Sequence, residues 1–286
     1  MEIKINGKPA DITLEAEKTV GEVLTGIHQW LDSTAETAGF FVSGLEIDEK
    51  SYGSRSLDEV FELSLKGISS INVKTSSWAE LMLEALVGLK NDLEVYESRT
   101  MDEQKNFWEQ WEKTAAAIFI MEHDRELYGF VRKTLKENPF SGSAPSTLTA
   151  GAAALVMERI REIEDPEREM TELKPLAEDI AKRLEDLPLD MQTGKDLKAA
   201  ETITVFSSLV EKIFRLIFLF KHFAADIDTI EVSSMTSEFS AALREMISAY
   251  ENKDTILVGD LAEYELAPRL RSLMALLSKT RMGGKS

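Results

Sequence analysis

Cysteine is absent from this chain of 286 residues, and histidine occurs only three times. Without cysteine the protein has no disulfide bonds, thiolate metal sites, iron–sulfur clusters or cysteine nucleophiles. No histidine stands in a His-Glu-x-x-His or Glu-x-x-His pattern, which removes the linear signatures of zinc peptidases and di-iron proteins. We therefore expect no cofactor, no metal and no catalytic residue.

Glycine-rich phosphate loops are missing too. The stretch TGKD at residues 193–196 lacks the upstream glycine that such a loop needs, and Gly-x-Ser-x-Gly and Gly-x-Gly-x-x-Gly do not occur. These absences favour a protein that is not an enzyme. An active site dispersed over several helices would leave no such motif, so the question of enzyme activity stays open.

Positive charge is scarce relative to negative charge. The chain has 33 Lys and Arg residues against 51 Asp and Glu residues, which gives a formal net charge of -18. A surface this acidic repels phosphate backbones and anionic lipids. Nucleic acid is therefore not an expected partner.

Uninterrupted apolar runs are also lacking. The most apolar stretch, residues 203–226, contains Glu211, Lys212 and Arg215, which are costly inside a bilayer. Its large apolar residues recur at steps of three and four, which predicts a central bundle helix with Phe214 and Ile217 fully buried. The opening sequence MEIKINGKPAD lacks a signal-peptide pattern. We expect no membrane span and a cytoplasmic location.

Residues 1–76 have the pattern of a mixed α/β domain. Two short alternating runs flank Asn6 and Gly7, which tolerate positive φ and predict a hairpin. A helix is predicted next, with Thr19 as its N-cap and Glu22 completing a capping box. The stretches AGFFVSGLEID and ISSINVKT then predict two strands, separated by a short helical turn in SLDEVF.

Two stretches in this region resemble ubiquitin-like β-grasp domains. DITLEAEKTVGEV is similar to their second strand and helix entry, and FFVSGLEIDEKSYGSRSLDEV to their third strand, short fourth strand and following turn. The resemblance covers about a quarter of the chain and implies a β-grasp fold. Ubiquitin and the sulfur carriers end in a free Gly-Gly, whereas here the last strand continues through INVKTSSWAELML. A carrier role is therefore disfavoured, and an embedded protein-binding module is favoured.

From Trp78 onward the spacing of apolar residues is helical. One long helix is predicted over residues 101–138, with Gly129 as a candidate break, and the clearest loop is predicted at about 138–147. We predict an α+β fold: a ubiquitin-like β-grasp domain at residues 1–76, followed at residues 77–286 by an all-helical bundle of about seven helices. The helical part resembles uncharacterised bacterial proteins without matching a family that we can name.

The stretch TILVGDLAEYELAPRL, residues 255–270, combines a strand-like start with three acidic residues. Asp254 stands at an N-cap position, which predicts a helix with an apolar stripe of Leu257, Leu261 and Tyr264. Glu265 is placed to pair with Arg269 at i+4. A solvated helix face is the preferred interpretation of the carboxylates, ahead of a partner contact or a metal or catalytic site.

Taken together, these patterns predict a non-catalytic adaptor or scaffold that binds a protein partner through the β-grasp sheet, the bundle or both. The alternative is an enzyme or small-ligand-binding helical bundle. A homo-oligomer stays open.

The candidate partner-binding residues lie on the outer face of the predicted sheet. Successive strand residues point to opposite faces. If Phe40 and Val42 point at the helix, Phe41 points away from it and shares the outer face with Lys4, Asn72 and Lys74. Ubiquitin-like domains commonly bind partners around an apolar residue of this strand, a position that Phe41 resembles. The other interpretation is that the protein's own helices cover this face.

Overall fold

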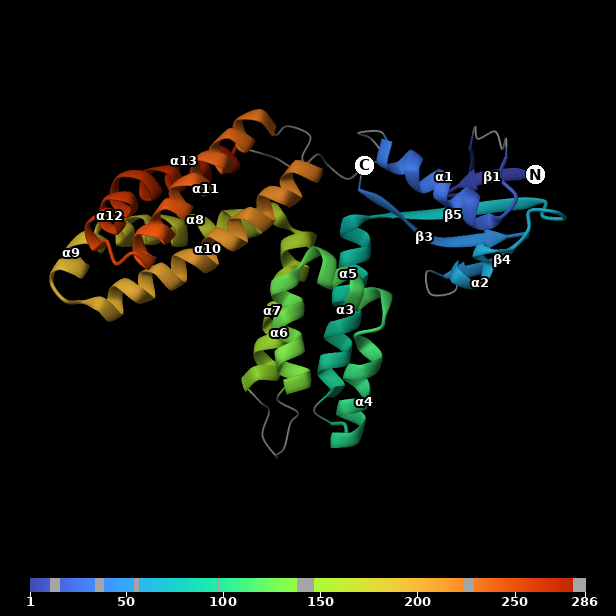
Figure 1. Ribbon diagram of the computed structural model, residues 1–286, viewed down its shortest axis with the longest axis horizontal. Helices are drawn as coiled ribbons and strands as arrows, with labels where there is room; N and C mark the ends of the chain where they lie inside the picture. The colour runs from blue at the N-terminus through green and yellow to red at the C-terminus, as the bar shows by residue number, and fades with distance from the viewer. Residues whose placement is uncertain are drawn as a thin grey trace. The chain divides into compact units, whose positions relative to one another are not determined.

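The computed structural model describes residues 1–10, 16–33, 39–53, 57–96, 98–137, 147–223 and 229–279. An N-terminal five-stranded sheet is followed by a mostly helical region, so the predicted α+β class is confirmed (Figure 1). Residues 11–15, which hold part of the second strand implied by the resemblance, lie outside the described residues. So do residues 138–146, which hold nearly all of the predicted loop.

The sheet is mixed, with strand order β2-β1-β5-β3-β4. Its first and last strands, β1 and β5, pair in parallel at the centre, and the other pairings are antiparallel. The β1–β2 hairpin turns at Asn6 and Gly7, both at positive φ as predicted. The bounds are β1 Glu2–Ile5, β2 Lys8–Pro9, β3 Phe40–Ile47, β4 Lys50–Gly53 and β5 Ser70–Ser77, with helices α1 Val20–Ser33 and α2 Leu57–Phe61 between them.

A compact hydrophobic core forms where α1 crosses one face of the sheet (Figure 1). The predicted capping box starts this helix: Glu22 N donates to Thr19 Oγ1, and Thr19 N donates to Glu22 Oε2. The buried residues are Ile3, Val20, Val23, Leu24, Ile27, Leu31, Leu45, Ile47, Val60, Ile71 and Val73.

A β-bulge between Val42 and Gly44 decides which residues of β3 enter this core. One extra residue reverses the alternation, so that Val42 packs on the core and Leu45, not Gly44, is the next to point inward. Phe40 is exposed at the first position of β3, opposite Ser77, and is not part of the core.

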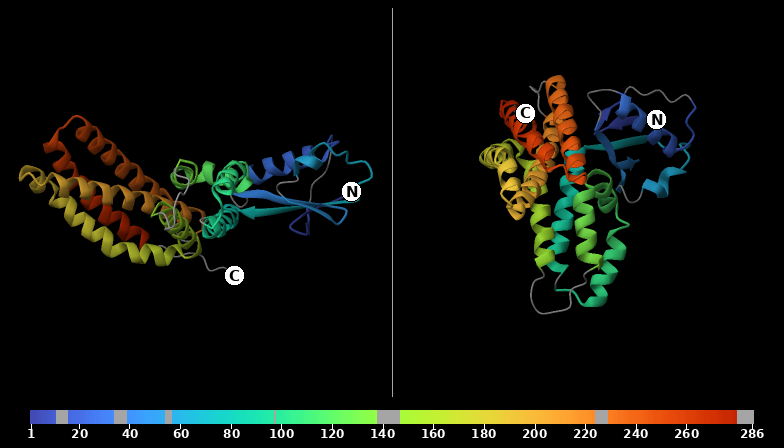
Figure 2. Two further views of the ribbon diagram at one scale, coloured as in Figure 1. Left: turned by 90° about the horizontal axis from the view of Figure 1, so that it is seen from below. Right: turned by 60° about the vertical axis from the view of Figure 1, so that its left-hand side comes forward.

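The helical region follows β5 directly and runs from α3 to α13. Figure 2 shows its helices from two further sides. The α-helices are α3 Trp78–Tyr96, α4 Met101–Trp111, α5 Ala115–His123, α6 Arg125–Arg132, α7 Thr147–Glu164, α8 Pro166–Glu185, α9 Leu187–Gln192, α10 Asp196–Phe223, α11 Thr229–Glu251, α12 Thr255–Asp260 and α13 Ala267–Leu277. Two π-helical segments, η2 Lys133–Glu137 and η3 Leu261–Leu266, continue α6 and α12.

The number of helices exceeds the predicted seven, in part because residues 101–138 do not form one long helix. The chain restarts twice, at Thr114 and Asp124, whose side chains accept from the N–H groups of Ala117 and Leu127 and cap α5 and α6. Gly129, the predicted break, lies inside α6. The helical spacing of apolar residues continues across Thr114 and Asp124, but the N-caps at these two residues begin a new helix each time.

Contacts between residues divide the chain into two compact units, Met1–Ile160 and Arg161–Ser286. We call them the N-terminal unit and the C-terminal unit. The N-terminal unit contains the sheet and helices α1 to α6, and the C-terminal unit contains α8 to α13, while α7 crosses the division.

The C-terminal unit is built around the Phe-rich helix α10. Phe206, Ile217 and Phe220 are buried, as the spacing indicates, but Phe214 is only half-buried and meets Phe239 of α11 edge-on at 6.1 Å. Full burial of Phe214 is therefore a wrong prediction. No helix among the described residues is long and apolar enough to cross a membrane.

The stretch after Asp254 is helical, as predicted, but its stripe is different. Asp254 Oδ1 accepts from Leu257 N at 3.0 Å and caps α12. Val258, Leu261 and Leu266 are buried, whereas Leu257 and Tyr264 of the predicted stripe are exposed. The π-helical segment η3 inserts an extra residue into the turn, so the i, i+4, i+7 stripe that would bury Tyr264 does not persist.

Candidate functional site

Three of the predicted partner-binding residues share the outer face of the sheet. Lys4 lies opposite Asn72 in the β1–β5 ladder, and Lys74 lies two residues further along β5. Asn72 Oδ1 accepts from Gly7 N at 2.9 Å, and Lys4 Nζ lies 3.0 Å from Glu2 Oε2. Lys74 is exposed. This part of the face is polar and carries both signs of charge.

The fourth residue, Phe41, also lies on the outer face but contacts other parts of the protein. Its ring meets Phe119 of α5 edge-on at 5.6 Å and His123 at 6.0 Å. His123 lies 4.4 Å from Phe119 and 6.2 Å from Trp78 at the start of α3. We call these four side chains the aromatic joint. Its geometry favours the interpretation in which the protein's own helices cover this end of the sheet.

The aromatic joint also lowers the basicity of its histidine. Burial against the neighbouring rings lowers the pKa of His123 below its ordinary value, and the nearby Glu122 carboxylate partly opposes this shift. Glu122 and Asp124 flank the ring along the chain. Folding therefore favours the neutral imidazole over the charged one more than the unfolded chain does.

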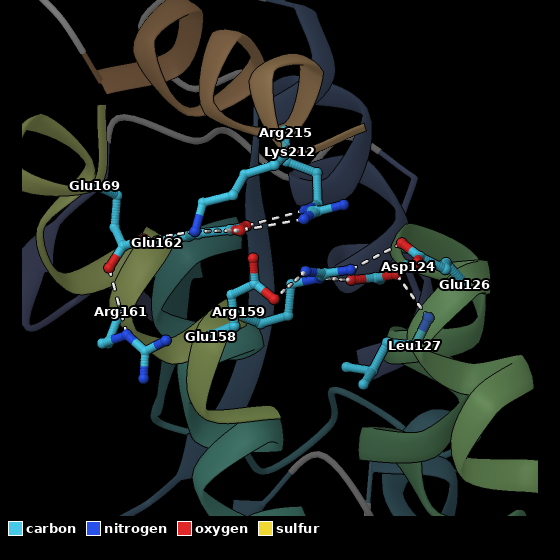
Figure 3. Close-up of polar contacts among 10 residues, drawn as sticks. All are labelled: Asp124, Glu126, Leu127, Glu158, Arg159, Arg161, Glu162, Glu169, Lys212 and Arg215. Atoms are coloured by element: carbon cyan, nitrogen blue, oxygen red, sulfur yellow. Dashed lines mark hydrogen bonds and ion pairs between the residues drawn. The ribbon is translucent and has the colours of Figure 1, made fainter. Parts of the chain in front are cut away.

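A buried cation lies in the N-terminal unit. The Arg159 side chain of α7 is 4% exposed, and its Nε and Nη2 donate to Asp124 Oδ2 and Glu126 Oε2, both at 2.8 Å (Figure 3). A third carboxylate, Glu158, lies 3.8 Å away. Asp124 has a second role, because its Oδ1 accepts from Leu127 N at 2.9 Å and caps α6. We call this set the Arg159 cluster.

Buried carboxylates lie in the C-terminal unit. The Glu162 side chain is 2% exposed and accepts from Nε and Nη2 of Arg215 at 2.9 and 3.1 Å (Figure 3). Lys212 lies 3.8 Å from Glu162 and donates to Glu169 at 2.6 Å. Arg161 Nε donates to the other oxygen of Glu169 at 3.3 Å. We call this set the Glu162 cluster, and it ties α8 and α10 to the end of α7.

Sequence reasoning missed both clusters. Lys212 and Arg215 were visible as charges that interrupt an apolar helix, a pattern that indicates buried ion pairs when no bilayer is involved. Their partners could not be identified, because Glu162 and Glu169 lie more than 40 residues away along the chain. Chemically, both clusters fix helices in place. Among the described residues, no group of three or more His, Asp or Glu side chains could hold a metal ion.

The tryptophans of α4 also pack inside the protein. Trp108 and Trp111 are buried, with ring centroids 5.4 Å apart, and Trp111 stacks on Tyr128 of α6 at 6.0 Å. Phe107 lies on the neighbouring face under the Arg99 guanidinium, at 4.4 Å. This side of α4 borders an open groove of about 500 Å³, lined by Asp92, Arg99, Glu103, Asn106, Phe107, Gln110, Trp111 and Thr114.

Large apolar side chains stand exposed at one end of the C-terminal unit. Leu189 of α9, Tyr250 of α11 and Ile256 of α12 are 59%, 57% and 74% exposed, and Leu257 is also exposed. Helix α12 packs on both α9 and α11, and the two views agree that α9, α12 and the last turn of α11 meet at this end (Figures 1 and 2). We call these four residues the end surface.

Comparisons with known proteins match the chain in two parts. Residues 1–77 match the family model described as the TP0873 N-terminal domain, and residues 168–276 match a domain of unknown function, DUF8042. The chain is also similar to an uncharacterized protein of Treponema pallidum (strain Nichols), with 23% identity over 279 residues, or 96% of this chain and 94% of the relative. No solved structure matches. A bacterial relative agrees with the bacterial resemblance of the helical region.

Proposed function

We propose that the protein is a non-catalytic adaptor or scaffold that binds other proteins. The observation that carries this proposal is the end surface of the C-terminal unit, where four large apolar side chains stand exposed beside a well-packed core. Exposed apolar side chains that gather at one place are typical of protein-binding surfaces, whereas single ones are common everywhere.

The Glu162 cluster supports this role by fixing α8 and α10, the helices on which α9 of the end surface packs. Buried ion pairs contribute little net stability, but their directional hydrogen bonds favour one arrangement of helices over others. In the C-terminal unit, Glu162 and Glu169 are held by Lys212 and Arg215 of α10. A rigid frame of this kind lowers the entropic cost of presenting a binding surface.

We further propose that residues 1–76 form a ubiquitin-like β-grasp domain and that it supplies a second binding surface. The parallel pairing of β1 with β5 and the position of α1 on one face support this proposal. The open part of its outer face would bind through Lys4, Asn72 and Lys74, while Phe41 contacts α5. We propose a cytoplasmic location, because a chain without cysteine forms no disulfide bonds and needs no oxidising compartment.

The alternative function, a small-ligand-binding helical bundle, is favoured by the groove beside α4. Its walls combine an aromatic ring, Phe107, with the polar groups of Arg99 and Asn106, a mixture that suits an organic ligand. Arg99 is already placed over Phe107 and lies 3.5 Å from Asp92. An anionic ligand would have to displace that carboxylate.

Native mass spectrometry of the protein purified from its source cell distinguishes the two functions. An adaptor is expected to retain a stoichiometric protein partner, and the complex should reform from the separately purified components. A small molecule bound at one equivalent, lost on Phe107→Ala, would support the alternative and count against the adaptor.

A further inference from the structure

We propose that the end surface binds a basic, amphipathic protein segment, whose apolar side chains cover Tyr250 and Ile256 and whose Lys or Arg residues face the surrounding carboxylates. This inference rests on the proposed adaptor function and names the chemistry of the partner. The inference depends on the geometry of α9, α12 and the last turn of α11, and on the charge around them.

The geometry places the exposed side chains next to one another. Gly259 of α12 lies so close to α9 that a Cβ added there would be 3.0 Å from the Cβ of Pro188. Ile256 precedes Gly259 by three residues and therefore lies on the same side of α12, beside α9. Leu189 directly follows Pro188. Leu189 and Ile256 thus stand within three residues of the close contact between Pro188 and Gly259.

Tyr250 joins the surface from the end of α11. The chain turns immediately after it: Lys253 N donates to Tyr250 O at 3.0 Å, and Asp254 N donates to Ala249 O at 2.9 Å. Lys253 adopts positive φ in this turn. The turn brings Tyr250 and Ile256 to the same corner, while Ala249 and Val258 point into the core.

The charge around the surface selects the partner. The segments 186–198 and 250–260 contain six carboxylates and three lysines, a net charge of -3. Two of the lysines are already used, because Lys195 and Lys198 lie 3.3 and 2.7 Å from the buried Asp190. The exposed rim is therefore acidic, and its carboxylates are Asp186, Asp196, Glu251, Asp254 and Asp260.

An acidic rim argues against a second copy of this chain as the occupant. A symmetric dimer through the end surface would place the same net charge of -3 against itself, between chains that each carry -18. An anionic bilayer is repelled for the same reason. A segment with apolar anchors and flanking Lys or Arg side chains satisfies both the exposed apolar area and the charge, and an amphipathic helix provides this pattern.

The proposal is tested with a fluorescent 18-residue amphipathic peptide of leucine and lysine, titrated against the full-length protein. We expect binding that weakens as salt is raised, and that Tyr250→Ser or Ile256→Ser reduces affinity at least about tenfold. The matched control is Leu176→Ser, an exposed leucine of α8, which should change affinity less than about twofold. All three variants should melt like the parent protein, because the replaced side chains are exposed.

The other outcomes count against the proposal in distinguishable ways. Equal binding of a leucine–glutamate peptide would show that charge does not select the partner. A concentration-dependent dimer in analytical ultracentrifugation, dissociated by Ile256→Ser, would identify a second copy as the occupant. No binding of the leucine–lysine peptide, or binding that Leu176→Ser weakens equally, would overturn this inference. The adaptor function would survive that result if a partner that reforms a complex with the purified protein is still found.

Discussion

The two units use buried charge in opposite ways. In the N-terminal unit one buried cation, Arg159, is surrounded by carboxylates, and two of these, Glu126 and Glu158, reach solvent. In the C-terminal unit the buried group is a carboxylate, Glu162, and its Arg215 and Lys212 partners are themselves largely buried. We therefore expect the two clusters to lose different amounts of stability when one charged partner is replaced. The cost of breaking an ion pair depends on whether the group left behind can be hydrated.

The contacts that accompany these clusters differ as well. The N-terminal unit joins its sheet to its helices through the rings of the aromatic joint, which interact by shape and by modest ring–ring attraction. The C-terminal unit relies on close helix packing around Gly259 and on the hydrogen bonds of the Glu162 cluster. Substitutions can measure separately how much the ring contacts and how much the close packing and hydrogen bonds contribute to stability.

The largest effect is expected from Arg215→Met. This change removes two hydrogen bonds from Glu162, a carboxylate that is only 2% exposed. Breaking a buried pair from one side typically costs about 3–5 kcal/mol of unfolding free energy. Urea denaturation followed by circular dichroism measures the loss.

Two matched variants sharpen this prediction. Arg159→Met should cost less than about 2 kcal/mol, because Asp124 keeps its bond to Leu127 N and Glu126 is exposed. The double variant Glu162→Leu, Arg215→Met should regain much of the lost stability, since no buried charge is left unpaired. If Arg159→Met proved as costly as Arg215→Met, hydration of the remaining groups would not explain the comparison.

Phe41→Ala tests the aromatic joint and is expected to cost less unfolding free energy than Arg215→Met. Its half-buried ring contacts Phe119 and His123, so truncation should cost about 2 kcal/mol, below the range for a fully buried Phe. Phe40→Ala is the control, because Phe40 is exposed on the same strand and should change stability by less than about 0.5 kcal/mol. A Phe41→Ala protein with an unchanged melting temperature but lost partner binding would instead identify Phe41 as a partner anchor.

Local signals in the sequence predicted local structure well. The Asn6-Gly7 hairpin turn, the Thr19 capping box and the Asp254 N-cap depend on residues within a few positions of one another, and all three are confirmed. The predicted pair of Glu265 and Arg269 also forms. Each of these features is determined by backbone geometry over one or two turns, which a single sequence displays directly.

Features that depend on a partner far along the chain could not be predicted. The π-helical segment η3 adds one residue to a regular helical pattern, and this displaced the prediction for Tyr264. The partners of Lys212 and Arg215 are selected by how three helices pack, which periodicity does not specify. The partner-binding role of the outer sheet face stays a prediction.

Alanine substitutions at Gly259 and Gly129 probe helix packing in the two units, and we expect them to change stability less than the substitutions above. A Cβ at Gly259 would lie 3.0 to 3.2 Å from three atoms of Pro188, whereas nothing lies within 4 Å of a Cβ at Gly129. Gly259→Ala should therefore destabilise the protein by about 1–2 kcal/mol through overpacking. Gly129→Ala should stabilise it by about 0.5–1 kcal/mol through helix propensity. Thermal denaturation of both variants checks the two signs, and a stabilised Gly259→Ala protein would mean that α9 moves freely away from α12.

The smallest effect is expected from the pH dependence contributed by His123. Burial lowers its pKa below the ordinary value of 6.5, so the unfolded chain takes up a proton before the folded protein does as pH falls. The stability from the neutral ring is therefore present above about pH 6.5 and is lost as pH falls below it. Glu122 opposes the pKa shift and the ring is partly open to solvent, which keeps the effect small. His123→Phe retains an aromatic ring against Phe119 without a titrating group, so melting temperatures from pH 7.5 to pH 5 should fall less steeply in this variant. If melting temperature fell with pH equally in the two proteins, His123 would be excluded as a source of the pH dependence. The aromatic joint would then contribute to stability through ring contacts and not through protonation.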